Sequence, residues 1–214
     1  MIRITRHGTE VAASEDAFGR LRDAYAARHH VRLPGFFADD LLSLVGRDLT
    51  AANFRISDHG RIARELALGE TPAYLAVLFL LNCPILFEAM AHIIGTDGIR
   101  RFDGRIYSMR AGADFYDSWH TDLGQPDEPR LAAISVNLGG PYEGGVLQMR
   151  EAESGRVIEE ISNRQRGDAI LFRVSPALQH RLLPVEGDAP RTACAGWFVR
   201  APRALPIAVP PRSV

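Results

Sequence analysis

The chain has 214 residues, of which 46% are hydrophobic and 24% charged, a composition typical of a globular protein with one substantial core. Its formal net charge of −1 argues against nucleic-acid binding driven by bulk attraction to phosphates. All 25 basic residues are arginine, so no lysine can act as nucleophile, Schiff base or anion anchor.

Cysteine usage and hydropathy indicate the compartment. Cys83 and Cys194 are too few for a disulfide framework or a thiolate zinc site, and we expect both to be reduced. The first ten residues contain no apolar stretch, so no signal peptide is expected. The longest apolar run, 74–90, is interrupted by polar residues and proline and falls short of the roughly 20 residues of a membrane span. These features predict a soluble cytoplasmic protein.

Apolar residues recur at helical spacing in the first hundred residues. The spacing is clear over residues 18–25 and again over 41–49. Thr71 followed by Pro72 is a typical N-cap and first turn, and it predicts a mostly buried helix that bends or breaks at Pro84. We therefore predict a helical support region over residues 1–100.

After residue 100 the pattern changes to short apolar runs separated by turn residues. Seven candidate strands cover residues 105–110, 131–138, 146–150, 157–161, 169–174, 179–183 and 192–199. Short strands at this spacing favour a β-sandwich or barrel over a parallel sheet. We expect a β-rich core over 101–200, packed with the helical region into one structural domain. The proline-rich tail over 201–214 is expected to be extended.

One candidate metal site stands out. His120 and Asp122 form an H-x-D pair, and on a strand residues two apart point to the same face, where both side chains can reach one ion. Such a pair is common by chance, but His180, near the start of a predicted strand, can complete a set of two imidazoles and one carboxylate. This facial triad suits Fe(II) and oxygen chemistry because it leaves coordination positions open. Zinc is the chemical competitor, although the helical H-E-x-x-H of many zinc hydrolases is absent from the sequence.

Arg191 adds a second requirement. In a regular strand it shares one face with Ala193, Ala195 and Trp197. An arginine that faces the interior of a sandwich is a buried cation, and it needs an anion opposite it. A dicarboxylate that chelates the iron at one end would supply this anion at the other, in bidentate pairing with the guanidinium.

These residues resemble the 2-oxoglutarate- and Fe(II)-dependent oxygenases, especially the prolyl 4-hydroxylase-like branch. The family's distal motif is similar to His180, Pro184-Val185, Gly187, Arg191 and Trp197-Phe198 of this chain. Further similar segments are GDAILF at 167–172, GGVL at 144–147, VNL at 136–138 and PGFF at 34–37.

The sequence departs from the family pattern at two places. The family usually has Ser or Thr where this chain has Ala193. Its cosubstrate-binding tyrosine usually lies nearer the H-x-D than Tyr107 does, and a simple register puts Met109 closer to that place. Tyr107 and Met109 would share a strand face, so either could line the pocket.

The resemblance implies an α+β fold: a double-stranded β-helix (a jelly-roll or cupin-like β-sandwich) as catalytic core over 101–200, with N-terminal helices packed on one sheet. It implies Fe(II), with 2-oxoglutarate and O₂ as cosubstrates, and hydroxylation of an unactivated C–H bond with succinate and CO₂ as co-products. The presence of Asp122 favours hydroxylation, because related halogenases lack this carboxylate, while desaturation and ring formation stay open. The implied roles are metal binding by His120, Asp122 and His180, and cosubstrate binding by Arg191, Tyr107 and Trp197.

The loop around the H-x-D supplies candidate substrate contacts, namely Arg110, Tyr116 and Trp119. We interpret Asp114 and Asp117 of the same loop as turn formers. The other histidines are interpreted as solvent-facing or core residues in tail or helical segments; they are His7, His29, His30, His59 and His92.

The expected substrate is a small molecule, an amino acid or a peptide, with no nucleic-acid or membrane partner, and the oligomeric state is left open. Two other functions stay open as well. One is a jelly-roll sensor that binds the metal or 2-oxoglutarate without turnover, and the other is a zinc hydrolase that uses the same three ligands.

Overall fold

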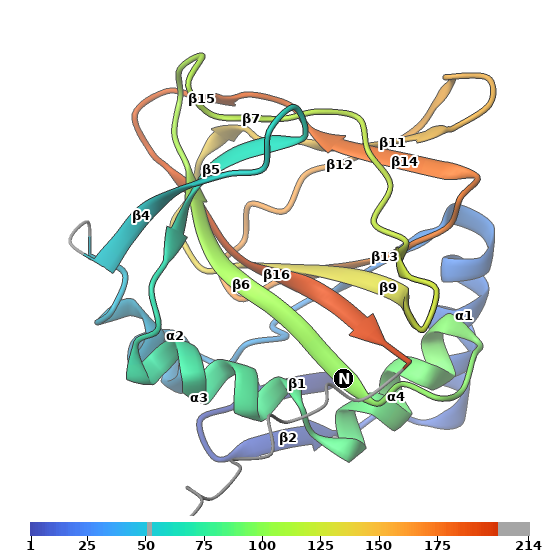
Figure 1. Cartoon of the computed structure of the whole chain (residues 1–214). Coiled ribbons are helices and arrows are strands. Elements are labelled where there is room, and N and C mark those ends of the chain that lie inside the picture. The colour runs from blue at the N-terminus through green and yellow to red at the C-terminus, as the bar shows by residue number, and fades with distance from the viewer. Residues whose placement is uncertain (51–52, 201–214) are drawn as a thin grey trace, which may run out of the picture.

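The computed structural model describes residues 1–50 and 53–200 (Figure 1). The tail over 201–214 lies outside the described residues. The helices are α1 (Glu15–Arg28), α2 (Asp39–Gly46), α3 (Pro72–Leu81) and α4 (Pro84–Ile94). The strands are β1 (Ile2–Thr5), β2 (Gly8–Val11), β3 (His30–Leu33), β4 (Phe54–Asp58), β5 (Ala63–Leu68), β6 (Arg101–Met109), β7 (Tyr116–Asp117), β8 (Gly124–Gln125), β9 (Glu128–Asn137), β10 (Glu143–Gly144), β11 (Leu147–Glu151), β12 (Val157–Ile161), β13 (Ala169–Arg173), β14 (Leu178–Leu182), β15 (Val185–Glu186) and β16 (Arg191–Val199).

The predicted helix break at Pro84 is confirmed. The Thr71 side chain accepts a hydrogen bond from the Tyr74 backbone N–H and caps α3, which ends at Asn82. A second helix then begins at Pro84, where a missing backbone donor costs nothing in the first turn. Within the described residues no single helix is long and apolar enough to cross a membrane, although α3 and α4, bent by 58° at their break, pass together on length and composition.

Two antiparallel sheets face each other. The larger sheet has nine strands, seven of them in the order β3-β13-β9-β16-β6-β5-β4, with β7 paired to β5 and β8 to β9. The smaller sheet has the order β12-β11-β14. In Figure 1 the smaller sheet lies above the β9, β16 and β6 strands, and α2, α3 and α4 lie below them. The predicted strands after residue 100 correspond to β6, β9, β11, β12, β13, β14 and β16.

The predicted helical support region over residues 1–100 also contains strands that the sequence did not predict. Five strands, β1 to β5, lie in that part of the chain. β3 pairs with β13, and β5 pairs with β6, so the front of the chain extends the larger sheet at two places. β3 has four residues and β5 has six, and their pairings with β13 and β6 join segments distant in sequence, so local periodicity carries little signal for them.

Alternation along the strands divides the core into two parts. Ile106 of β6 belongs to the core between the larger sheet and the helices, together with Leu81 and Phe198. The next residue, Tyr107, belongs to the core between the two sheets, together with Phe172. This period of two is expected for a sheet with both faces covered. The expected double-stranded β-helix with helices packed on one sheet is confirmed, and the candidate site lies between the sheets.

Candidate active site

A cavity of about 460 Å³ opens between the two sheets. Its lining includes all three predicted metal ligands, and also Arg191, Tyr107 and Trp197. Further lining residues include His59, Arg105, Asp117, Arg130, Ser135 and Phe172. The size is that of a typical small-molecule site, which combines mostly apolar walls with a few converging polar groups.

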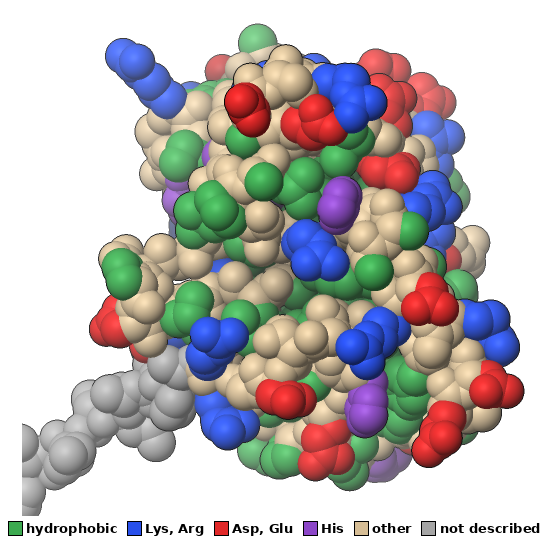
Figure 2. All heavy atoms as spheres, turned by 90° about the vertical axis from the view of Figure 1, so that its right-hand side faces the viewer, with side chains coloured by type: hydrophobic (Ala, Val, Ile, Leu, Met, Phe, Trp, Pro, Cys, Tyr) green, Lys and Arg blue, Asp and Glu red, His purple; other side chains and the backbone are tan. Residues whose placement is uncertain are grey.

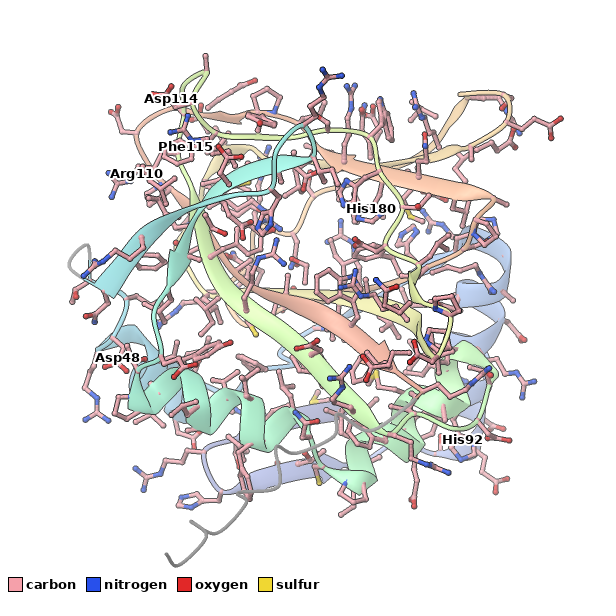
Figure 3. The ribbon with its side chains drawn as sticks, viewed as in Figure 1. Asp48, His92, Arg110, Asp114, Phe115 and His180 are labelled. Carbon is pink, nitrogen blue, oxygen red and sulfur yellow. The ribbon has the colours of Figure 1, made fainter. Side chains whose placement is uncertain are left out.

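Three side chains converge on one point of this cavity. His120, Asp122 and His180 each offer a ligand atom, and these atoms lie within 4.8 Å of one another. His180 Nε2 is 3.2 Å from Asp122 Oδ2, and His120 Nε2 is 3.6 Å from Asp122 Oδ1. Figure 3 labels His180, whose side chain reaches from β14 into the space between the sheets. Two imidazoles and a carboxylate at these separations can hold Fe(II) or another divalent cation.

Backbone contacts fix the two histidines against each other. His120 and His180 exchange two backbone N–H to carbonyl hydrogen bonds, of 3.1 and 3.0 Å. His120 Nδ1 lies 2.7 Å from the Ser118 carbonyl oxygen, so this nitrogen carries the proton and Nε2 is free to bind a metal. The H-x-D pair does not converge through strand alternation, because His120 makes an isolated bridge to His180 and Asp122 follows in irregular chain.

Asp122 is held from the side of the larger sheet. Its Oδ2 accepts a hydrogen bond of 2.8 Å from the Trp197 indole N–H, and its Oδ1 lies 3.5 Å from an Arg130 nitrogen. Burial raises the pKa of Asp122. The hydrogen bond and charge of His180, followed by the charge of His120 and the hydrogen bond of Trp197, lower it by more, so the net pKa lies well below the ordinary range. The carboxylate is therefore ionised, the state in which it can bind a cation.

Arg191 meets the expectation of a buried cation. Only 4% of the residue is exposed, Nη1 donates to the Tyr107 hydroxyl at 2.6 Å, and Nη2 donates to Ser135 Oγ at 2.9 Å. Both partners are neutral, and Arg191 forms no ion pair with any carboxylate of the described residues. Because arginine stays protonated in proteins, this arrangement fits the carboxylate of a ligand.

Gly145 makes room for the Arg191 side chain. Its φ of +55° favours glycine, and a Cβ built there would meet Arg191 Cδ at 2.9 Å. On the opposite face of β16, Thr192 donates a hydrogen bond of 3.1 Å to Ser108. The GGVL segment at 144–147 contains Gly145, whereas sequence reasoning missed Ser135, which lies inside β9 and belongs to no motif.

Sequence reasoning also missed a buried ion pair in the cavity wall. Both oxygens of Glu65 in β5 accept hydrogen bonds from Arg105 of β6, one of them at 3.1 Å. His59, in the turn between β4 and β5, lies 3.6 Å from the same carboxylate and lines the cavity. Its assignment to a tail or helical segment is wrong, as is that of His30, which lies in β3. The strands β3, β4 and β5 were not predicted from the sequence, so the pairing of Glu65 with Arg105 was not predicted either.

The interpretation of Asp117 as a turn former is also wrong. Asp117 lies in β7, where it pairs with Ala63 of β5; it lines the cavity, and its Oδ1 is 3.5 Å from His120 Nδ1. Burial raises the pKa of Asp117 above its ordinary value, against the opposing charges of His120 and His180. In Figure 3, Asp114 lies with Arg110 and Phe115 at one end of the molecule, away from His180.

The three candidate substrate contacts are not among the described residues that line the cavity. Arg110 is exposed, and the Tyr116 hydroxyl donates to a backbone carbonyl of the turn between β4 and β5. Trp119 packs between two guanidiniums, with Arg150 Cζ at 4.3 Å and Arg181 Cζ at 4.5 Å from its ring centroid. Their role in substrate binding stays a prediction.

Trp197 has a different partner from the expected one. Its ring lines the cavity, but its N–H donates to Asp122, so its polar atom contacts a proposed metal ligand and not the Arg191 end of the cavity. Whether the ring also contacts 2-oxoglutarate stays a prediction.

Comparison with known proteins agrees with this geometry. Residues 105–199 match the family model described as the 2OG-Fe(II) oxygenase superfamily. No functionally curated protein matches the chain. A prolyl-4-hydroxylase from Pseudomonas putida is similar in structure, with a TM-score of 0.65 and 19% identity over 86% of this chain and 100% of that one. A 2OG-Fe(II) oxygenase family oxidoreductase from Burkholderia pseudomallei has a TM-score of 0.63 and 18% identity over 89% and 94%.

A third similar structure is the alpha-ketoglutarate-dependent epimerase SnoN from nogalamycin biosynthesis. It has a TM-score of 0.65 and 14% identity, over 94% of this chain and 90% of its own. At these identities the three structures show a shared fold, and they confirm the expected likeness to prolyl 4-hydroxylases at that level. Residues 105–199, which contain all three candidate metal ligands and Arg191, thus match the 2OG-Fe(II) oxygenase superfamily of enzymes, and this match implies Fe(II) as cofactor and 2-oxoglutarate and O₂ as cosubstrates.

Proposed function

We propose that the chain is a hydroxylase in which His120, Asp122 and His180 bind Fe(II) and Arg191 binds the far carboxylate of 2-oxoglutarate. The observation that carries this assignment is the pairing of the two features in one cavity. A set of three ligand atoms lies beside a buried cation whose hydrogen-bond partners within the described part of the chain are neutral hydroxyls. A dicarboxylate that chelates a metal and reaches an arginine satisfies both.

The chain's own residues have three tasks in this function. The Ser118 carbonyl keeps the Nδ1 proton on His120, so that Nε2 faces the metal. Phe172 packs edge-on against the His180 ring, with centroids 4.9 Å apart, and limits its rotation. Leu147, Ile170 and Leu182 add apolar wall and reduce the water in the cavity. When bound, iron with 2-oxoglutarate and O₂ supplies the oxidising power, and succinate and CO₂ are the co-products.

The substrate class follows from the size of the site. A volume of about 460 Å³, shared with 2-oxoglutarate, leaves room for a small molecule, an amino acid or one side chain of a peptide. The names of two similar structures support a peptide substrate and a small-molecule substrate, respectively. A prolyl hydroxylase from Trichoplax adhaerens is in complex with a peptide fragment, and SnoN belongs to nogalamycin biosynthesis. We infer hydroxylation of a C–H bond, because Asp122 occupies one metal position with a carboxylate.

A cytoplasmic location and the absence of a nucleic-acid partner are part of the proposal. Cys83 and Cys194 are both free, as expected in a reducing compartment. On the face that Figure 2 shows, acidic and basic side chains are interspersed. This mixture supports a function without a phosphate-binding surface on that face.

One experiment separates the proposed enzyme from its two alternatives. The full chain is supplied with Fe(II), ascorbate, 2-oxoglutarate and O₂, and succinate is quantified with and without a panel of candidate substrates. The hydroxylase forms succinate only with Fe(II) and O₂, and a substrate that stimulates it gains one oxygen atom in the mass spectrum. A sensor binds 2-oxoglutarate without forming succinate, and a zinc hydrolase is active with Zn(II) in the absence of O₂.

The matched variants are Asp122→Ala and Asp114→Ala. Asp122→Ala removes a proposed metal ligand and is expected to abolish succinate formation. Asp114 lies in the exposed loop away from His180, so its replacement is the control for removal of a carboxylate. Full activity of Asp122→Ala would exclude the assigned triad.

A further inference from the structure

Arg130 is a cation of the cavity with incomplete partners. It lies at the start of β9, with its side chain 28% exposed and an Nη1 that is 3.5 Å from Asp122 Oδ1. Among residues 1–50 and 53–200 its guanidinium forms no hydrogen bond, and Asp122 is its only ion-pair partner. Asp122 is also a proposed metal ligand, so a bound metal would compete for the same carboxylate.

The other two arginines of the cavity are accounted for. Arg105 donates to both oxygens of the buried Glu65, so this pair is neutral in sum. Arg191 would receive the far carboxylate of 2-oxoglutarate. The charges of Fe(II), Asp122, 2-oxoglutarate and Arg191 then cancel, and Arg130 is the cation that remains without a counter-charge. A half-buried cation in this position is stabilised by an incoming anion.

Two further acidic groups near Arg130 do not supply that anion. Asp103 forms no ion pair with Arg130 within 4 Å, and its ion-pair partner is Arg101. Asp117 lines the cavity, but its Oδ1 lies 3.5 Å from His120 Nδ1 and it forms no ion pair with Arg130. The charge of Arg130 is thus less than fully compensated by the described residues.

Packing holds the guanidinium in a position to bind a planar anion. Arg130 Cζ lies 3.5 Å from the centroid of the Trp197 ring, which is van der Waals contact. The Trp197 N–H is in turn bonded to Asp122, so the three side chains form one cluster beside the proposed iron ligands. A guanidinium donates in its own plane, so stacking leaves its edges free, and one edge faces Asp122.

We propose that Arg130 binds a carboxylate of the substrate, so that the substrate class is a carboxylic acid such as a free amino acid or the C-terminal residue of a peptide. The inference rests on the proposed function, because it takes the cavity beside His120, Asp122 and His180 as the reaction site. It excludes an internal residue of a long chain, unless that residue carries a side-chain carboxylate. Binding through Arg130 would place carbon atoms near the carboxylate within reach of the metal position.

The test compares matched acids and amides on the full chain loaded with Zn(II) and saturating 2-oxoglutarate. The probes are the N-acetyl derivatives of the common amino acids, their C-terminal carboxamides, and phenyl phosphate as another oxyanion. Binding is measured by saturation-transfer NMR and competition. We expect the binders to come from the acids and each to bind about 10- to 100-fold more tightly than its carboxamide, the range for a hydrogen bond to a charged group.

Variants locate the effect at one side chain. Arg130→Gln should remove the preference for acids, and Arg130→Lys should restore part of it, because the charge returns without the planar fork. Arg101→Gln is the matched control, since Arg101 pairs with Glu128 and does not line the cavity. If Arg130→Gln does not fold, the comparison of acids with amides on the unmodified chain still decides the question.

The outcomes are distinguishable from a failure of the proposed function. Binding of 2-oxoglutarate to the Zn(II)-loaded chain is measured first by calorimetry, and its absence would contradict the proposed function itself. If 2-oxoglutarate binds but acids bind no better than amides, or no acid binds, only the role of Arg130 is overturned. An unchanged preference in Arg130→Gln, or binding of phenyl phosphate in place of the carboxylates, also overturns it.

Discussion

Replacement of Arg191 by methionine separates ligand binding from stability. Arg191 donates to Tyr107 and Ser135, both neutral, and only 4% of it is exposed. In the ligand-free protein its charge has little compensation, so Arg191→Met should leave the free energy of unfolding within about 1 kcal/mol of the unmodified chain or raise it. Binding of 2-oxoglutarate should suffer greatly, because the far carboxylate loses its charged partner.

The expected loss can be worked out from the contacts. A carboxylate accepts two charge-assisted hydrogen bonds from one guanidinium, each worth about 1.5–3 kcal/mol, so the sum is about 3–6 kcal/mol. At about 1.4 kcal/mol per factor of ten, the Kd for 2-oxoglutarate rises roughly 100- to 10,000-fold. At a concentration of 100 times the original Kd, 2-oxoglutarate stabilises the unmodified chain by about 2.7 kcal/mol and the variant by about 0.4 kcal/mol or less.

Urea unfolding with and without 2-oxoglutarate, in the presence of Mn(II), measures both quantities. Tyr107→Phe is the companion variant, since it removes one hydrogen bond from the guanidinium to a neutral hydroxyl, worth about 1.5–3 kcal/mol, and keeps the cation. If Arg191→Met retains the stabilisation by 2-oxoglutarate, Arg191 is not the anchor. If the ligand-free variant instead loses several kcal/mol, the charge of Arg191 is compensated in the free protein and the reasoning from its neutral partners is wrong.

Three further predictions concern other parts of the site and the core. Trp197→Phe keeps an aromatic ring but removes the donor to Asp122, so the affinity for Co(II) should fall about 10- to 100-fold, as measured by absorption spectroscopy. An unchanged affinity would show that this hydrogen bond does not position Asp122. Glu65→Gln leaves Arg105 without its counter-charge and should lower the free energy of unfolding in urea by about 3 kcal/mol, whereas a loss below about 1 kcal/mol would mean that the pair behaves like a surface pair. Burial raises the pKa of the Cys194 thiol to about 12, so at pH 8 a thiol reagent should react with the partly exposed Cys83 alone. Rapid reaction of both thiols would contradict the burial of Cys194.

The parts of the fold that the sequence predicts well are those with regular alternation and clear turns. β16 is an example, because Arg191, Ala193, Ala195 and Trp197 alternate with the residues of the helix-facing core, and the expected common face is borne out by their positions. The helix break at Pro84 is another, because a proline and an N-cap act within a few residues. Local physical chemistry is enough for both.

The features that sequence reasoning missed depend on contacts between distant segments. Glu65 and Arg105 are 40 residues apart, and their pairing exists only because β5 joins the sheet beside β6. Asp117 has the residue type of a turn, and its position in the cavity comes from pairing with β5. The H-x-D pair converges for a reason other than the one predicted, since a two-way backbone bridge replaces strand alternation. Tertiary pairing overrides local preference in each case.

The two-way backbone bridge between His120 and His180 also divides the ligand set between the two layers of the sandwich. Both imidazoles are tied to β14 of the smaller sheet, whereas the carboxylate of Asp122 is tied to Trp197 of the larger one. A metal bound by all three would act as a cross-link between the sheets within the cavity. Amide hydrogen exchange along β14 and β11 would then slow when metal is added, while exchange in the helix-covered face of β6 would change little. Loading the site would thus stiffen the sandwich across the space between its two sheets, where the substrate is proposed to react.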